Sequence, residues 1–73
     1  MTILGKTAKV KMVDRALSFT GYPVQFDPPL QVTGIVKEKA IFIFERLCVE
    51  FEHNFQKFTV WKDVDSGEVE VLQ

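Results

Sequence analysis

The sequence predicts an all-β fold: a small barrel or strongly curved antiparallel sheet of five to six strands, of the SH3-like or OB-like type. Three observations support this. Apolar and polar side chains alternate with a period of two, the alternating stretches contain many β-branched and aromatic residues, and single glycines or prolines separate them. With no linker or repeat, residues 1–73 are expected to form one small β-rich domain around one core.

The first half of the chain is predicted to form three strands. Residues 5–14 alternate apolar residues with lysine and threonine, which is typical of a strand with one buried face. A second strand over residues 17–26 is expected to kink at Gly21. It should end at Asp27-Pro28-Pro29, because proline removes ladder donors. The chain then re-enters the sheet over residues 30–36, which are rich in β-branched side chains.

The middle segment fits two templates. Lys37-Glu38-Lys39 is expected to form the tip of a hairpin that leads into a strand starting with Ile41-Phe42-Ile43-Phe44. Read with a period of 3.6, the same region carries an apolar stripe, so the alternative is an α+β fold with one helix over residues 39–56. The strand is favoured because isoleucine and phenylalanine lose side-chain freedom in a helix and no convincing N-cap precedes the segment.

The end of the chain carries the strongest hairpin signal. Residues 58–62 and 68–72 are predicted strands, and the loop between them ends in Gly67, where a positive φ is needed. Basic residues dominate the start of the chain and acidic residues its end. We interpret these as two neighbouring antiparallel strands with cross-strand pairs, in preference to a polarised surface for a partner.

The cysteine content, the hydropathy pattern and the net charge together predict the compartment of the protein. Cys48 is the only cysteine, which excludes an internal disulfide, and a lone thiol suits a reducing compartment, so we expect a cytoplasmic protein. The N-terminus lacks the apolar run of a signal peptide, and no stretch approaches the roughly 18 apolar residues that cross a bilayer. The net charge of −1 gives no global attraction to nucleic acid or anionic lipid.

No motif predicts catalysis, a metal site or a cofactor. His53 is the only histidine, and the scattered carboxylates around it lack the spacing of metal ligands. Cys48 has no signature of an activated nucleophile and is expected to be a half-buried sheet residue. The acidic loop before Gly67 resembles a calcium loop, but its glycine falls one position early. We therefore expect a protein that is not an enzyme and that uses neither metal nor cofactor.

The aromatic content is the main functional clue. Seven Phe, one Tyr and one Trp are more than a core of this size readily accommodates. A period of two places Phe42 and Phe44 on one face of that strand and the neighbouring isoleucines on the other. Either both faces are buried within the chain, or a second subunit or a partner protein covers one of them. The interface candidates are Phe42, Phe44, Tyr22 and Trp61. They favour a non-enzymatic protein-binding module, a small intracellular inhibitor or adaptor that acts as a homo-oligomer.

The alternative is a ligand-binding protein that sequesters a nucleotide or short oligonucleotide. Aromatic rings on a small barrel can stack bases while lysines meet the phosphates. The candidate anion contacts are Lys9, Lys11 and Lys62, with Lys57 as a further lysine of the same kind. The basic excess typical of nucleic-acid binders is missing, which is why a protein partner is preferred.

Overall fold

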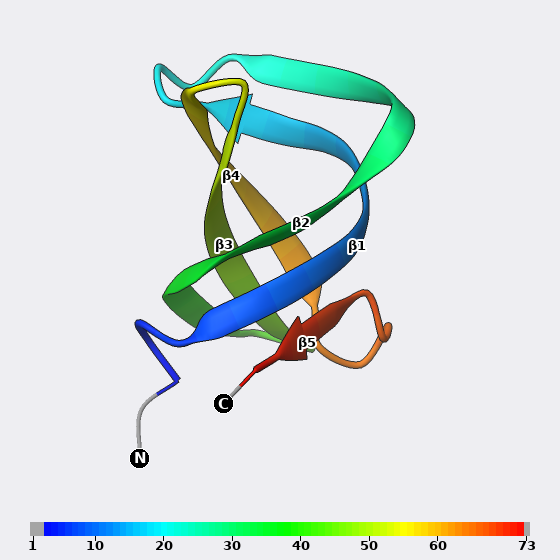
Figure 1. The fold of residues 1–73 in the computed structure, drawn as a ribbon. Coiled ribbons are helices and arrows are strands. Elements are labelled where there is room, and N and C mark those ends of the chain that lie inside the picture. The colour runs from blue at the N-terminus through cyan, green and yellow to red at the C-terminus, as the bar shows by residue number, and fades with distance from the viewer. Residues whose placement is uncertain (1–2, 73) are drawn as a thin grey trace.

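The computed structural model describes residues 3–72, and the regular structure in that range consists of strands (Figure 1). In chain order these are β1 (Thr7–Ser18), β2 (Pro23–Ile41), β3 (Glu45–His53), β4 (Gln56–Asp63) and β5 (Val69–Val71). They form one antiparallel sheet in the order β2-β3-β4-β1-β5, and an additional pairing of β1 with β2 closes the sheet partly into a ring. The predicted all-β fold with a curved antiparallel sheet is confirmed. The alternative helix over residues 39–56 is wrong, because those residues form the end of β2, a turn, β3, a second turn and the first residue of β4.

The core lies inside the curved sheet and receives inward-facing side chains from every strand. Alternate residues of β3 and β4 point inward, so Leu47, Val49 and Phe51 are buried beside Phe58 and Val60. The whole cluster comprises Ala8, Val10, Val13, Ala16, Val36, Leu47, Val49, Phe51, Phe58, Val60 and Val69. Full burial of a valine or leucine side chain contributes about 1.5–3 kcal/mol, and this cluster is the main source of stability.

A bulge in β1 allows the sheet to curve. The register of β1 against β2 shifts on either side of Val13, and Met12 has a positive φ of 32°. The bend divides β1 into two halves with different neighbours. Its first half pairs with β5, and its last two residues, Leu17 and Ser18, pair with β4. Figure 1 shows β1 sweeping from one end of the molecule to the other.

Two predictions for the first half of the chain are wrong. The strand expected from Leu17 is the end of β1, and Gly21, with a φ of 91°, lies in the turn that follows. Asp27-Pro28-Pro29 does not end a strand, because β2 runs through it. On either side of the two prolines, the β2 residues that pair with β1 are Gln25 and Leu30, and β3 pairs only with residues of β2 from Ile35 onward. The prolines therefore interrupt no ladder that needs their missing donors.

The predicted hairpin tip at Lys37-Glu38-Lys39 is also wrong, because this segment lies within β2 and the turn comes later, at residues 42–44. All three charged residues are exposed, and the two lysines meet carboxylates on β3. Lys37 Nζ lies 3.8 Å from Glu50 Oε1, and Lys39 Nζ lies 3.2 Å from Glu45 Oε2. This polar run therefore belongs to an exposed part of β2, where cross-strand ion pairs support it.

The end of the chain folds differently from the predicted hairpin. Gly67 has the expected positive φ of 79°, but β5 pairs with β1 and not with β4. The Lys11 N–H donates to the Glu68 carbonyl at 2.8 Å, which holds the start of β5 against β1. The sequence predicted that the basic start and the acidic end of the chain form neighbouring antiparallel strands. This is confirmed, since Lys9 on β1 and Glu70 on β5 are register partners.

Candidate functional site

Large exposed apolar side chains gather at the two ends of the molecule. One group occupies the β2–β3 turn, and we call it the apolar tip: Ile41, Phe42, Ile43 and Phe44, with exposed fractions of 69%, 91%, 74% and 55%. The other group is the aromatic end: Phe19 and Tyr22 in the β1–β2 turn and Phe55 in the β3–β4 turn, with exposed fractions of 84%, 72% and 97%. Strand β3 begins at the apolar tip and ends at the β3–β4 turn, so the groups lie at its opposite ends.

The apolar tip is held at its base by polar contacts. The Val64 N–H donates to the Glu45 carbonyl at 2.9 Å, which ties the loop after β4 to the first residue of β3. Arg46 Nε lies 3.2 Å from Asp63 Oδ1 across the β3–β4 pair. Together with the Lys39–Glu45 pair, this leaves the charges around the tip matched, while its four apolar side chains face solvent.

The four predicted interface residues do not come together. Phe42 and Phe44 lie in the apolar tip, at a turn and not on a strand face as predicted. Tyr22 lies at the aromatic end. Trp61 is half-buried on the outer face of β4, where the Arg46 guanidinium carbon lies 5.9 Å from its ring centroid. Such a cation–π contact accounts for Trp61 within the chain itself.

The predicted anion contacts are also separated. Lys9 and Lys11 lie on β1, and Lys9 faces its acidic register partner on β5. Lys62 is engaged: its Nζ lies 2.9 Å from Glu68 Oε1 and donates to the Met12 carbonyl at 3.1 Å. Its side chain is only 15% exposed. Lys62 therefore joins β4 to the bulge of β1 and to the loop before β5.

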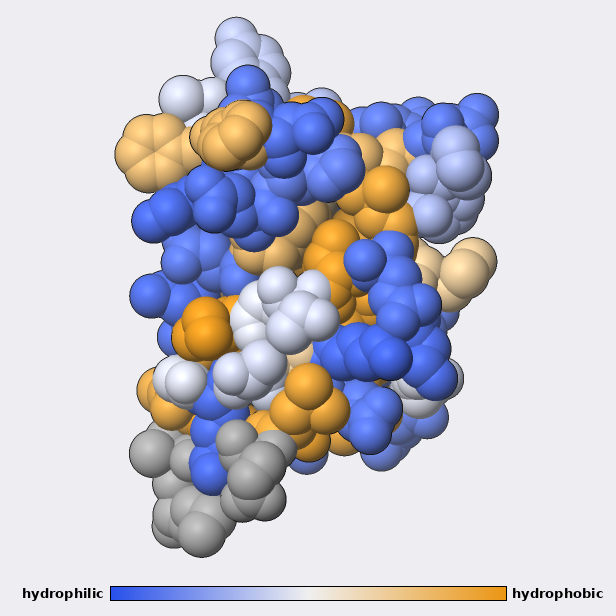
Figure 2. Space-filling view, in the orientation of Figure 1, coloured by the Kyte–Doolittle hydropathy of each residue, from blue (hydrophilic) through white to orange (hydrophobic). Residues whose placement is uncertain are grey.

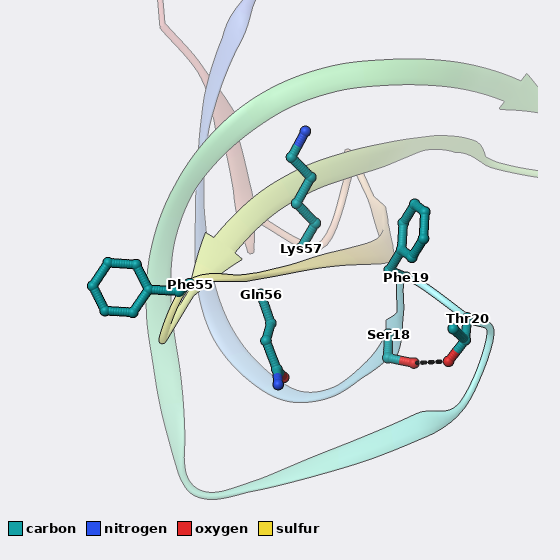
Figure 3. Close-up of a pocket in the computed structure, with 6 residues that line it drawn as sticks. All are labelled: Ser18, Phe19, Thr20, Phe55, Gln56 and Lys57. Atoms are coloured by element: carbon teal, nitrogen blue, oxygen red, sulfur yellow. Dashed lines mark hydrogen bonds between the residues drawn. The ribbon is translucent and has the colours of Figure 1, made fainter.

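A hollow of about 450 Å³ opens at the aromatic end (Figure 3). It lies where the β1–β2 and β3–β4 turns run side by side, and it is lined by Ser18, Phe19, Thr20, Phe55, Gln56 and Lys57. Ser18 Oγ and Thr20 Oγ1 are 3.2 Å apart and form a hydrogen bond. Lys57 makes no ion pair with any residue between 3 and 72. In Figure 2 apolar side chains stand out from a hydrophilic surface at this end.

Phe55 adopts an unusual backbone conformation. It is the second residue of the two-residue β3–β4 turn, and both Asn54 and Phe55 have positive φ values, 53° and 65°. This is the geometry of a type I′ turn, for which asparagine followed by glycine is the preferred sequence. A phenylalanine here is both conformationally strained and almost fully exposed.

His53 and Cys48, the two residues that the sequence analysis considered for catalysis or metal binding, both pack against other side chains of the fold. His53 packs against Phe26, with ring centroids 5.4 Å apart and an edge-on geometry. Cys48 is 5% exposed, and burial, reinforced by the carboxylates of Glu38 and Glu50, raises the pKa of its thiol above 9.0. Such a thiol keeps its proton at neutral pH and is a poor nucleophile. Among residues 3–72, no three metal-ligating side chains lie close enough together to hold a metal ion.

Comparison with protein-family models, with curated proteins and with solved structures found no match to this chain. None of the described residues lies in a helix long and apolar enough to cross a membrane. The functional reading therefore depends on the surface of the chain itself.

Sequence reasoning did not select Phe19, Phe55, Ile41 or Ile43 as site residues. The available signal was the short segment His53-Asn54-Phe55-Gln56 between two predicted strands, because asparagine often opens a two-residue turn. A turn there places Phe55 at an exposed position, whereas the helical alternative assigned it to an apolar stripe.

Proposed function

We propose that this chain is a non-enzymatic protein-binding module that inserts its apolar tip into a concave apolar pocket of a partner protein. The observation that supports this proposal is the run of four consecutive apolar side chains exposed at one hairpin turn. Contiguous apolar surface of this kind is rare on monomeric proteins and usually marks an interaction site. Large aromatic side chains such as Phe42 are also typical binding hot spots.

The charges around the tip favour a protein over a lipid surface. An interfacial membrane anchor combines apolar side chains with surplus lysine and arginine that attract anionic lipids. Here Lys39 and Arg46 flank the tip, and each is paired with a carboxylate within 3.2 Å. A neutral rim around an apolar centre is the arrangement of a protein–protein interface.

The module would act by occupying a surface of its partner, as a small inhibitor or an adaptor. A reducing compartment such as the cytoplasm suits the buried and protonated thiol of Cys48. This role needs no reacting group, and the partner is defined by its concave apolar pocket.

A photo-crosslinking amino acid in place of Phe42 tests the proposal. Irradiation in the cells that produce the protein should join it to one partner, and the same probe at exposed Lys37 should give little of that product. The affinity of the purified partner for the Phe42→Asp variant should then be at least about 30-fold lower than for the unaltered chain, because hot spots contribute roughly 2 kcal/mol or more.

Two results would contradict the proposal. One is an affinity for the crosslinked partner that Phe42→Asp leaves unchanged. The other is binding of the purified chain to lipid vesicles that Phe42→Asp abolishes, which would assign the tip to a membrane. The Phe55→Gly variant serves as the control at the opposite end, and it should bind the partner as tightly as the unaltered chain.

A further inference from the structure

The aromatic end has a different chemistry from the apolar tip. Its large apolar groups are three aromatic rings, and the hollow between its turns adds an ammonium group, two hydroxyl groups and a carboxamide. Aliphatic side chains, which make up half of the tip, do not line this hollow. Flat rings combined with hydrogen-bonding groups and an unpaired cation suit a ligand that is itself flat, polar at its edges and negatively charged.

The strained turn indicates that Phe55 makes a contact outside the chain. Glycine would relieve the positive φ of 65° and remove an aromatic side chain that is 97% exposed. Within the chain the Phe55 ring therefore gains little from its position, while the backbone is strained. Strained residues of this kind cluster at binding sites, where the contact with a ligand offsets the strain.

The arrangement of the hollow restricts the ligand further. Figure 3 shows Phe19 and Phe55 at opposite ends of it with Lys57 between them, and the Phe55 ring points outward, away from the other lining residues. The two rings do not face one another, so they cannot hold one flat group between them. Each ring is open to one flat group, and Lys57 lies between the two rings.

We infer that the aromatic end binds single-stranded nucleic acid. One base stacks on Phe19, a following base stacks on Phe55, and the phosphate between them meets Lys57. Thr20 and Gln56 line the same hollow and can meet the base edges or the sugar, whereas the Ser18 hydroxyl is engaged: it bonds Thr20 Oγ1 and accepts from the Tyr22 N–H at 3.1 Å. Lys57 is the one cation among the residues that line the hollow, and Glu52 lies opposite it in the β3–β4 ladder, so the site suits about one phosphate charge and not a nucleoside triphosphate.

The experiment uses the full chain and an oligothymidylate of about eight nucleotides, with binding followed by fluorescence anisotropy. Phe19→Ala and Phe55→Gly should each weaken binding about tenfold, because each removes one stacking ring. The logarithm of the affinity should fall with the logarithm of the salt concentration with a slope of about −0.7, as expected for one phosphate contact. Lys57→Gln should bring that slope close to zero. Phe42→Ala and Lys37→Gln, away from the hollow, should leave affinity and slope unchanged.

Other outcomes would overturn the inference. Binding that Phe55→Gly and Lys57→Gln leave unaltered would place the oligonucleotide elsewhere, and the absence of binding at millimolar concentration would exclude it. Thymidine monophosphate bound as tightly as the oligonucleotide would show that only one base is held. Self-association without nucleic acid that Phe55→Gly abolishes would assign the aromatic end to a second copy of the chain.

Discussion

Phe55 has a backbone conformation that does not suit its side chain. A residue with a Cβ atom at a φ of 65° is less stable than glycine by roughly 1–2 kcal/mol, and glycine offsets part of this gain through its larger loss of backbone freedom. We therefore expect Phe55→Gly to raise the free energy of unfolding by about 0.5–1 kcal/mol. Urea denaturation followed by circular dichroism measures this change.

Gln56 provides the matched control in the same hairpin. It is the first residue of β4 and is not among the residues with positive φ, so Gln56→Gly should lower the stability by about 0.5–1 kcal/mol. Opposite signs for these two neighbouring substitutions would establish the strain at Phe55. A loss of stability in Phe55→Gly comparable to that in Gln56→Gly would show that the ring supports the fold.

Cys48 is expected to make the free energy of unfolding depend on pH in the alkaline range. Burial and the carboxylates of Glu38 and Glu50 raise the pKa of its thiol in the folded chain, so the folded state keeps a proton that the unfolded state releases near pH 9.0. The resulting stabilisation is complete below that pH and is lost as the pH rises through the folded-state pKa. The melting temperature should therefore fall less steeply above pH 9.0 in Cys48→Ala than in the unaltered chain. Parallel pH profiles would refute this assignment.

The close approach of β2 to β3 depends on Gly34. A Cβ atom at this position would overlap the carbonyl oxygen of Glu50 and would lie 2.9 Å from Val49 Cγ1. Because the obstructing atoms include strand backbone, they cannot move without disturbing the β2–β3 ladder. Gly34→Ala should therefore destabilise the protein by about 1–3 kcal/mol, measured by urea denaturation.

Thr33 is the control for this prediction. It precedes Gly34 on the exposed face of β2, and Thr33→Ala should change the stability by no more than about 0.5 kcal/mol. Equal effects of the two substitutions would mean that β2 and β3 separate readily and that their close approach contributes little to stability.

Sequence periodicity identified several strands but misplaced some of their connections. The alternation that buries Leu47, Val49 and Phe51 is visible in the sequence, because it reflects one strand with one dry face. The partner of β5 is not visible, since the turn at Gly67 suits either a hairpin with β4 or a crossing to β1. Hydrogen bonds between distant residues decide that choice. The same limit applies to Lys37-Glu38-Lys39, where carboxylates on β3 keep a charged run within a strand.

At the scale of the whole molecule, five of the nine aromatic residues are exposed, and they divide between two ends of a body 32 Å long. The sequence revealed the surplus of rings, because a core of this size has a limited volume. The sequence did not reveal that the exposed rings lie at two separate ends, because this depends on the positions of the turns in the curved sheet. If both proposed sites bind, this separation would let the apolar tip and the aromatic end hold different partners without competition.

The apolar tip leads to a prediction about the free protein. Without its partner, the tip exposes four apolar side chains, and the net charge of −1 provides little repulsion between copies. We expect two tips to cover one another, which agrees with the homo-oligomer expected from the sequence. Light scattering should then give a mass above the 8.4 kDa of one chain. Replacing both Phe42 and Phe44 with aspartate should reduce it to 8.4 kDa with the circular dichroism spectrum unchanged.

The aromatic end provides the control for this measurement. Phe55→Gly removes the most exposed ring at the opposite end and should leave the oligomer intact. If the double variant at the tip keeps the mass of the unaltered chain, the tip does not mediate self-association. If instead every variant and the unaltered chain give 8.4 kDa, the tip is free for a partner at all concentrations. Binding through the tip would then require no dissociation of a homo-oligomer, and the affinity measured for the partner would be independent of the concentration of the chain.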